Sequence, residues 1–308
     1  MPSTNSTSAR PRAQDPTAAQ IGRGKSDLET VRVRSVFHPT DFSEASEIAF
    51  AHALKIALQA KAELTIFHVD AGSTLRWRDF PGVRTMLERW DVLPRGSSRS
   101  AIGKLGMDVN KVISPSKNAV KACLNFMEEH PTDLIVLAVR QEESRVRCLD
   151  KSVGKPIARA AGQMTLFIPH GMEGFVSRND GSISLRNILL PVTSKPRPQP
   201  GVEAIGRLIR HLHLAPGVVT VLHVGPAAEM PSIKVPTDSR WTWNRLTKTG
   251  DPAHVILQTA TNLHSDLIVM TTDGPDGFLD GLRGTTSELV LRKARCPVAT
   301  LPVGSLLD

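Results

Sequence analysis

The sequence predicts an α/β protein made of two tandem domains, each with a parallel sheet of about five strands flanked by helices. Three observations support this fold class. A chain of 308 residues suits two domains of roughly 130–150 residues each. Short, wholly apolar runs alternate with helix-like stretches, which is typical of strands buried on both faces of a parallel sheet. The order of these elements in the first half is repeated in the second.

The N-terminal segment, residues 1–32, differs from the rest of the chain. It is rich in Ser, Thr, Ala and Arg and lacks the apolar core of a secretory signal. Asp15, Asp27 and Glu29 argue against an organelle transit peptide, because such peptides are poor in acidic residues. We therefore interpret residues 1–32 as a disordered tail.

The repeat begins with a pair of apolar runs that each reach a Pro and a polar turn. The first is VRSVFHPTDFS at 33–43, and its counterpart is NILLPVTSK at 187–195. A helix-like stretch follows each run and lies at about 201–213 in the second half. A second apolar run then follows in each half. It is LTIFHVD at 64–70 in the first half and VVTVLHVGP at 218–226 in the second. Apolar runs of this length between turn residues predict buried strands.

The parallel continues through both halves. HPTDLIVLAV at 130–139 corresponds to HSDLIVMTT at 264–272, and MTLFIP at 164–169 corresponds to CPVATLP at 296–302. The segment between the halves carries Gly, Asn, Asp and Ser and no long apolar run. The sequence therefore predicts four parts in chain order: a tail (1–32), a first domain (33–169), a linker (170–186) and a second domain (187–308).

Composition narrows the class of protein. No segment approaches the roughly 18 uninterrupted apolar residues of a membrane-spanning helix. The formal net charge is +8, but Lys and Arg are spread along the chain and aromatic residues are only 4%, which argues against a nucleic-acid surface. Cys123, Cys148 and Cys296 lack a CxxC spacing and are typical of reduced thiols. We therefore expect a cytoplasmic protein without a membrane or nucleic-acid partner.

These runs and turns resemble the universal stress protein (UspA) family, in the form of two domains fused head to tail. The likeness covers about 33–169 and 187–303. Its motifs are PTDFSEASEIAF at 39–50, the HV strand ends at 68–69 and 223–224, GDPAHVIL at 250–257, DLIVM at 266–270 and GTTSELVLRKARCPV at 284–298. The resemblance implies two Rossmann-like domains of the adenine nucleotide alpha hydrolase-like type.

The resemblance also implies a contact between the domains. Dimers of this family usually pair through the last strands, which are about 164–169 and 298–302 here. A fused pair can make that contact within one chain as a pseudo-dimer, because two similar domains offer each other similar surfaces. A homodimer and unidentified protein partners are compatible with the same family.

ATP-binding members of the family carry a Gly-x2-Gly-x9-Gly-(Ser/Thr) loop after the fourth strand and an Asp after the first. The resemblance implies that the loop holds the phosphates, with Mg²⁺ accompanying them, and that residues at the strand ends contact the adenosine. In the second half, Gly274-x9-Gly284-Thr285 matches most of the loop, while Thr271 stands at the first glycine. The implied nucleotide-binding residues are Thr193, Val224, Met270, Gly274, Gly284, Thr285, Thr286 and Ser287.

Neither half carries the whole motif. In the second half Thr193 stands where the first half has Asp41, so a ribose would meet a hydroxyl in place of a carboxylate. In the first half, Ala138, Gln141 and Lys151 stand at the three glycine positions. Side chains there take the room and the positive φ that glycine allows. The first half is therefore predicted to be a poor nucleotide site.

Two of these features have a structural alternative. Thr285-x-x-Glu288 is a capping box, which would satisfy the first amides of a helix internally and leave fewer for a phosphate. Asp41 stands before a helix, where Asp is favoured as a cap whatever the function. A protein-interaction module of the same family, without a nucleotide, is therefore the alternative function.

Evidence for other chemistry is weak. The histidines lack metal-ligand spacing, so we predict no metal site. No nucleophile elbow, Ser/His/Asp arrangement or complete GxxxxGK(S/T) loop occurs, so no residue is predicted to be catalytic, and any ATP hydrolysis would be slow.

Segments 70–107 and 225–246 hold the four tryptophans, Trp77, Trp90, Trp241 and Trp243. We interpret these segments as lids or interface loops, with packing as the default role of the rings and ligand stacking as the alternative.

Overall fold

The computed structural model describes residues 33–70, 72, 82–139, 154–236, 240–273 and 285–303, without the side chains of residues 154, 155, 159 and 160. The predicted tail lies outside these residues.

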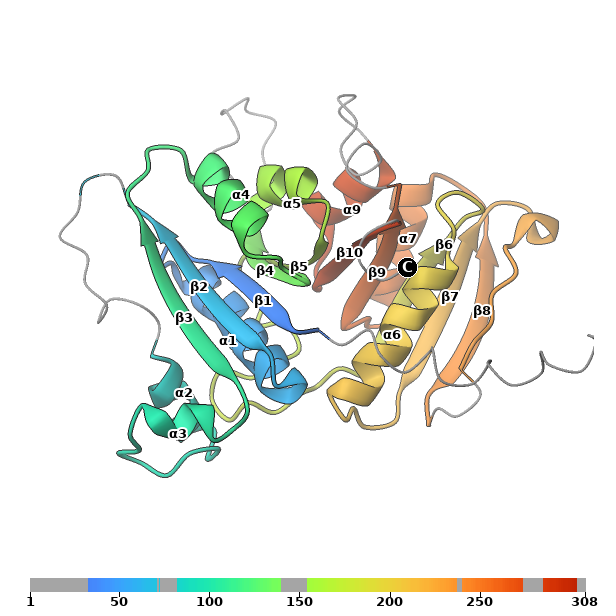
Figure 1. Cartoon of the computed structure of the whole chain (residues 1–308). Coiled ribbons are helices and arrows are strands. Elements are labelled where there is room, and N and C mark those ends of the chain that lie inside the picture. Colours follow the sequence, from blue (N-terminus) through green and yellow to red (C-terminus); the bar gives the residue numbers. More distant parts are fainter. Residues whose placement is uncertain are drawn as a thin grey trace, which may run out of the picture. The chain divides into compact units, whose positions relative to one another are not determined.

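The first half alternates strands with helices, as the apolar runs predict (Figure 1). Its elements are β1 (Ser35–Pro39), α1 (Glu44–Ala60), β2 (Glu63–Val69), α2 (Val83–Arg89), α3 (Ser100–Gly103), β3 (Asp108–Ser114), α4 (Ala119–Glu129), β4 (Leu134–Val139), α5 (Gly154–Ala161) and β5 (Met164–Pro169). Helix α1 begins after Ser43, whose hydroxyl accepts the Ser46 N–H, and ends at Lys61, which has a left-handed φ of 53°. These end signals determine where the chain re-enters the sheet.

The second half repeats this order. Its elements are β6 (Asn187–Val192), α6 (Gln199–His211), β7 (Val218–Val224), the short 3-10 helix η2 (Ala227–Glu229), β8 (Thr242–Lys248), α7 (Pro252–Asn262), β9 (Leu267–Thr272), α9 (Thr286–Lys293) and β10 (Val298–Pro302). The helix predicted at about 201–213 starts at Gln199. It ends at His211, because the chain turns at His213, which has a left-handed φ of 48°. Helix α7 is capped by Asp251, which accepts the His254 N–H at 2.8 Å.

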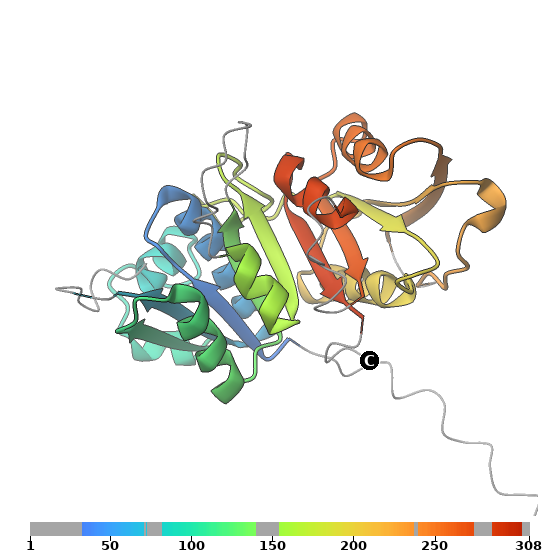
Figure 2. The same ribbon diagram turned by 90° about the horizontal axis from the view of Figure 1, so that it is seen from above.

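The ten strands form one sheet in the order β3-β2-β1-β4-β5-β10-β9-β6-β7-β8. Neighbours are parallel except β5 and β10, which pair antiparallel with Leu166 opposite Ala299 and lie side by side in both views (Figures 1 and 2). The predicted α/β fold, with five strands per half and contact through the last strands, is thereby confirmed. The division at 169 and 187 stays a prediction, because the described residues share one continuous sheet.

Two hydrophobic clusters cover the two faces of the sheet. One contains Leu54 of α1 and Ile205 of α6. The other contains Cys123 of α4, Ile157 of α5 and Val290 of α9. We call these the α1–α6 face and the α4–α9 face. Helices on both faces explain why the strands read as continuous apolar runs in the sequence.

The segment 170–186, called the connector below, packs against the first half. Nε2 of His52 on α1 accepts the backbone N–H groups of Phe175 and Val176 at 3.0 and 3.1 Å. The indole N–H of Trp90 donates to the Arg178 carbonyl at 3.1 Å. Phe175 and Val176 are buried. The linker prediction did not include this docking, because two isolated apolar residues make no periodic signal.

The segments after β2 and β7 each bury one tryptophan in the core, although most of their described residues are exposed or half-buried. Trp90 and Trp241 are 6% and 4% exposed and belong to the cluster of the α1–α6 face, in line with packing as their default role. Trp243 lies in β8, where the sequence predicted a loop. The edge strand β8 is half exposed and mostly polar, so it lacks the continuous apolar run that marked the central strands. Trp77 lies outside the described residues.

Candidate functional site

Each half has a topological switch point, where ligands bind in open α/β sheets. In the first half β1 lies between β2 and β4, and in the second half β6 lies between β7 and β9. The connections after these strands run to opposite faces, since α1 and α6 cover one face while α4, α5, α7 and α9 cover the other. A crevice is therefore expected beyond the carboxyl ends of β1 and β4, and of β6 and β9.

Strand register shows which residues correspond at the two switch points. Pro39 lies opposite the residue before His68, and Pro191 lies opposite the residue before His223. In the first half Nδ1 of His68 donates to the Thr40 carbonyl, just beyond β1, at 2.7 Å. In the second half Nδ1 of His223 donates to the Val192 carbonyl, at the end of β6, at 3.3 Å. Asp41 and Thr193 therefore occupy equivalent places, two residues after the proline.

The second switch point brings Val224 and Met270, the strand-end residues implied to contact the adenosine, to one face. Met270 is buried in the cluster of the α4–α9 face, and Val224 is half-buried against that cluster. Thr193 is exposed after β6. The loop from Thr193 to α6 also carries Lys195 and Arg197, both exposed. Positive charge there would attract an anionic ligand.

Helix α9 starts at the same switch point, after the predicted glycine loop. Gly274 and Gly284 lie outside the described residues. The Thr285 hydroxyl accepts the Glu288 N–H at 3.3 Å, which is one half of the predicted capping box. Thr286 and Ser287 form the first turn and are half-buried. Only one first-turn amide is satisfied by this cap, and by helix geometry the others have no partner within the helix.

Thr272 is a residue that the sequence analysis did not single out. It is 2% exposed, and its Oγ1 is buried without a hydrogen-bond partner in the described part of the chain. Thr259 on α7 has a buried hydroxyl of the same kind. The available sequence signal was a hydroxyl residue at the end of an apolar strand, at a position where the repeat has Val139.

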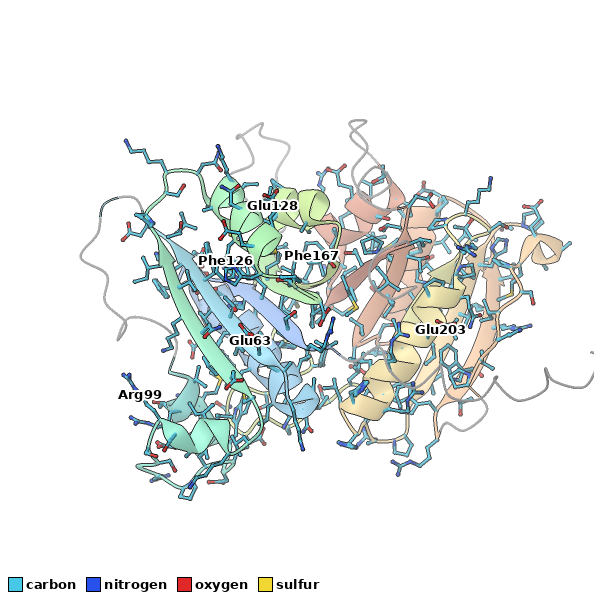
Figure 3. All side chains as sticks on the ribbon, in the orientation of Figure 1. Glu63, Arg99, Phe126, Glu128, Phe167 and Glu203 are labelled. Atoms are coloured by element: carbon cyan, nitrogen blue, oxygen red, sulfur yellow. The ribbon has the colours of Figure 1, made fainter. Side chains whose placement is uncertain are left out.

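The layer between sheet and helices also differs between the halves. In the first half Phe126 of α4, marked in Figure 3, packs against Phe37 and Phe67 with ring centroids 5.8 and 5.0 Å away. The second half has smaller residues at the corresponding positions. Thr259 corresponds to Phe126, because each lies eight residues after its helix cap. Leu189 and Leu222 correspond to Phe37 and Phe67 by strand register. At these three positions the first half thus has aromatic rings and the second half has smaller side chains.

At the first switch point, polar and aromatic side chains contact other residues of the protein. The Asp41 carboxylate accepts the N–H and the hydroxyl of Ser43 at 3.0 and 2.6 Å, so Ser43 rather than Asp41 caps α1. Phe42, with a φ of 59°, stacks on His68 with centroids 4.2 Å apart. The glycine positions Gln141 and Lys151 lie outside the described residues.

A pocket of about 180 Å³ lies between this turn and α2. It is lined by Thr40, Phe42, Ser43, Glu47, Phe50, Gly82 and Met86. Ligand pockets usually have at least roughly 300 Å³, so this volume is small for a nucleotide.

Burial favours the neutral forms of two histidines and two cysteines. Burial lowers the pKa values of His38 and His52 to about 4 and raises those of the Cys123 and Cys296 thiols to about 12. Neutral thiols are poor nucleophiles.

Within the described ranges, no group of three or more His, Cys, Asp or Glu side chains is placed to hold a metal ion. None of the described helices has the length and apolarity to span a bilayer.

Comparison with known proteins places these features in a family. The model of the universal stress protein family matches residues 33–169 and 243–302. A search of curated protein sequences found no match.

Solved structures show the same fold. A universal stress protein from Archaeoglobus fulgidus DSM 4304 is 16% identical, with a TM-score of 0.56, over 87% of this chain and 98% of that one. A putative universal stress protein from Pseudomonas aeruginosa UCBPP-PA14 is 14% identical, with a TM-score of 0.57, over 89% and 95%. The cytoplasmic domain of a prokaryotic cation chloride cotransporter is 12% identical, with a TM-score of 0.50, over 89% and 97%. At these identities the likeness concerns the fold alone.

Proposed function

Because this chain belongs to the universal stress protein family, we propose that its second half binds ATP or a related adenine nucleotide. One observation carries the proposal: Val224 and Met270 share the face on which α9 begins. The base would lie on these two strand ends, and the phosphates would meet the first N–H groups of α9. Thr193 would contact the ribose. The protein would then act in the cytoplasm in a stress response or in regulation.

Phosphate binding also has electrostatic support. Lys195 and Arg197 are exposed in the loop that leaves the second switch point. Mg²⁺ would arrive with the phosphates, because the described carboxylates, thiols and imidazoles form no metal-binding group of their own. Asp273, exposed after β9, is a carboxylate that such an ion could meet.

Calorimetric titration with ATP tests the proposal. We expect one ATP per chain for the wild type. Val224→Arg should raise Kd by about tenfold or more, because it places a charged chain on the apolar strand end. Val69→Arg is the matched control, since Val69 is also half-buried at the end of its strand. Gly284→Asp, in the predicted loop, should weaken ATP binding by repelling phosphate.

The outcomes separate the alternatives. Absence of binding at millimolar ATP would end the nucleotide proposal. Equal losses in Val224→Arg and Val69→Arg would mean that the effect is on folding, and unchanged binding in Val224→Arg would mean that the site is elsewhere.

A protein-interaction module without nucleotide is the second candidate. It is favoured by the first half, where Asp41 bonds to Ser43 and Phe42 stacks on His68. Groups that a nucleoside would need are engaged within the protein there. Two ATP molecules per chain would contradict this interpretation of the first half, and none would favour the module for the whole chain.

A further inference from the structure

We infer that the Thr272 hydroxyl binds the neutral, nucleoside part of the nucleotide, an inference that rests on the proposed function. Thr272 is the last residue of β9 and is 2% exposed. Its Oγ1 is buried and has no hydrogen-bond partner among the described residues. A buried hydroxyl without a partner destabilises a protein, so its presence requires an explanation.

The side chain points toward the proposed site. Alternate residues of a strand face the same side, so Thr272 shares the face of Met270. Met270 belongs to the cluster against which Val224 packs. The Thr272 carbonyl already accepts the Val303 N–H at 2.7 Å. The side-chain hydroxyl, in contrast, has no partner among the described residues.

The repeat supplies an internal comparison. Val139 lies opposite Pro169, and Thr272 lies opposite Pro302, in each case at the last pair of the two strands. Both carbonyls accept the N–H of the residue that follows the partner strand, at 2.8 and 2.7 Å. Val139 is 2% exposed and belongs to the same face. The half without the glycine motif thus has a methyl group where the half with most of the motif has a hydroxyl.

Burial indicates which part of the ligand Thr272 would meet. A phosphate would bring charge into a layer of apolar side chains, which is costly without paired cations. A neutral purine ring nitrogen, an exocyclic amine or a ribose hydroxyl can accept from or donate to a threonine at little cost. The second half has smaller side chains in this layer than the first, since Thr259 stands where α4 carries Phe126.

Three variants test the inference, with ATP and adenosine as separate probes. Thr272→Val should raise Kd about three- to tenfold for both probes, the loss expected for one hydrogen bond. Thr272→Ser keeps the hydroxyl and should stay within about twofold of the wild type. Val139→Thr, the same exchange reversed in the first half, should leave both affinities unchanged.

Thermal unfolding without ligand gives a second measurement. Thr272→Val should keep or raise Tm, because it removes an unpaired hydroxyl, whereas Val139→Thr should lower Tm.

Several results would overturn the inference. Wild-type binding that is unchanged by Thr272→Val would remove Thr272 from the site while leaving the proposed function intact. A loss for ATP but not for adenosine would assign the hydroxyl to the phosphates. A marked fall in Tm for ligand-free Thr272→Val would show that the protein itself uses the hydroxyl. A wild type that binds neither probe would end the proposed function and this inference together.

Discussion

Nε2 of His52 lies 3.0 Å from the backbone nitrogen of Phe175 and accepts its hydrogen bond. Nδ1 of the same ring donates to the Ile48 carbonyl at 2.9 Å. The imidazole is therefore neutral, because a protonated ring has no lone pair to accept with. One buried side chain thus joins α1 to the connector.

This arrangement predicts loss of stability in acid. Burial lowers the pKa of His52 to about 4 in the folded chain, against 6.5 for an exposed histidine. Well above pH 6.5 the ring is neutral in both states and the stabilisation is complete. As pH falls toward 4 only the unfolded chain takes up the proton, which costs about 3 kcal/mol of unfolding free energy. Urea unfolding across this range would measure the loss.

His52→Gln provides the comparison for the acid effect. The variant should lose about half of the pH dependence, because burial also lowers the pKa of His38 to about 4 and His38 keeps its share. A pH dependence identical to that of the wild type would contradict the assignment to His52.

Trp90→Phe should weaken the attachment of the connector. The change removes the hydrogen bond to the Arg178 carbonyl and should lower the unfolding free energy by about 1 kcal/mol, plus a packing loss. Trp243→Phe is a suitable control, because the Trp243 Nε1 is buried without a partner within the described ranges. Chemical denaturation should show the larger effect for Trp90, and equal effects would argue against a role for the hydrogen bond.

Asp266→Ala should destabilise the strand pair at the second switch point. Oδ2 of Asp266 accepts the N–H groups of Arg186 and Asn187, both at 2.8 Å, and so ties the start of β9 to β6. Loss of two hydrogen bonds to a charged group should cost about 2–4 kcal/mol. Asp108→Ala, at an exposed carboxylate, should cost less than about 0.5 kcal/mol. Similar melting temperatures for the two variants would refute this role.

Thr300→Arg should disrupt the junction of the halves. Thr300 lies opposite Thr165 in the antiparallel pair of β10 and β5, and the two are 1% and 0% exposed. An unpaired charge there should cost several kcal/mol. Thr242→Arg, on an exposed position of β8, is the control. Limited proteolysis should cleave Thr300→Arg faster, and resistance equal to the control would contradict the prediction.

The predictable parts of the fold are those with a local signal. Strand β4 is a continuous apolar run, and the repeat placed its counterpart β9 without any structural information. Strand β8 was missed because an edge strand buries only part of its length. The cap at Thr285 was found because its partner lies three residues away. Thr272 was missed because its significance depends on which hydroxyls find partners in three dimensions.

Apolar periodicity and the internal repeat were enough to derive an α/β protein with two similar halves, since burial on both faces of a sheet selects residue types over a few neighbouring positions. Tertiary structure decided the docking of the connector on His52 and the unpaired hydroxyl of Thr272. Both depend on which groups far apart in the chain come together in the fold, and no local pattern encodes which distant donor reaches which acceptor.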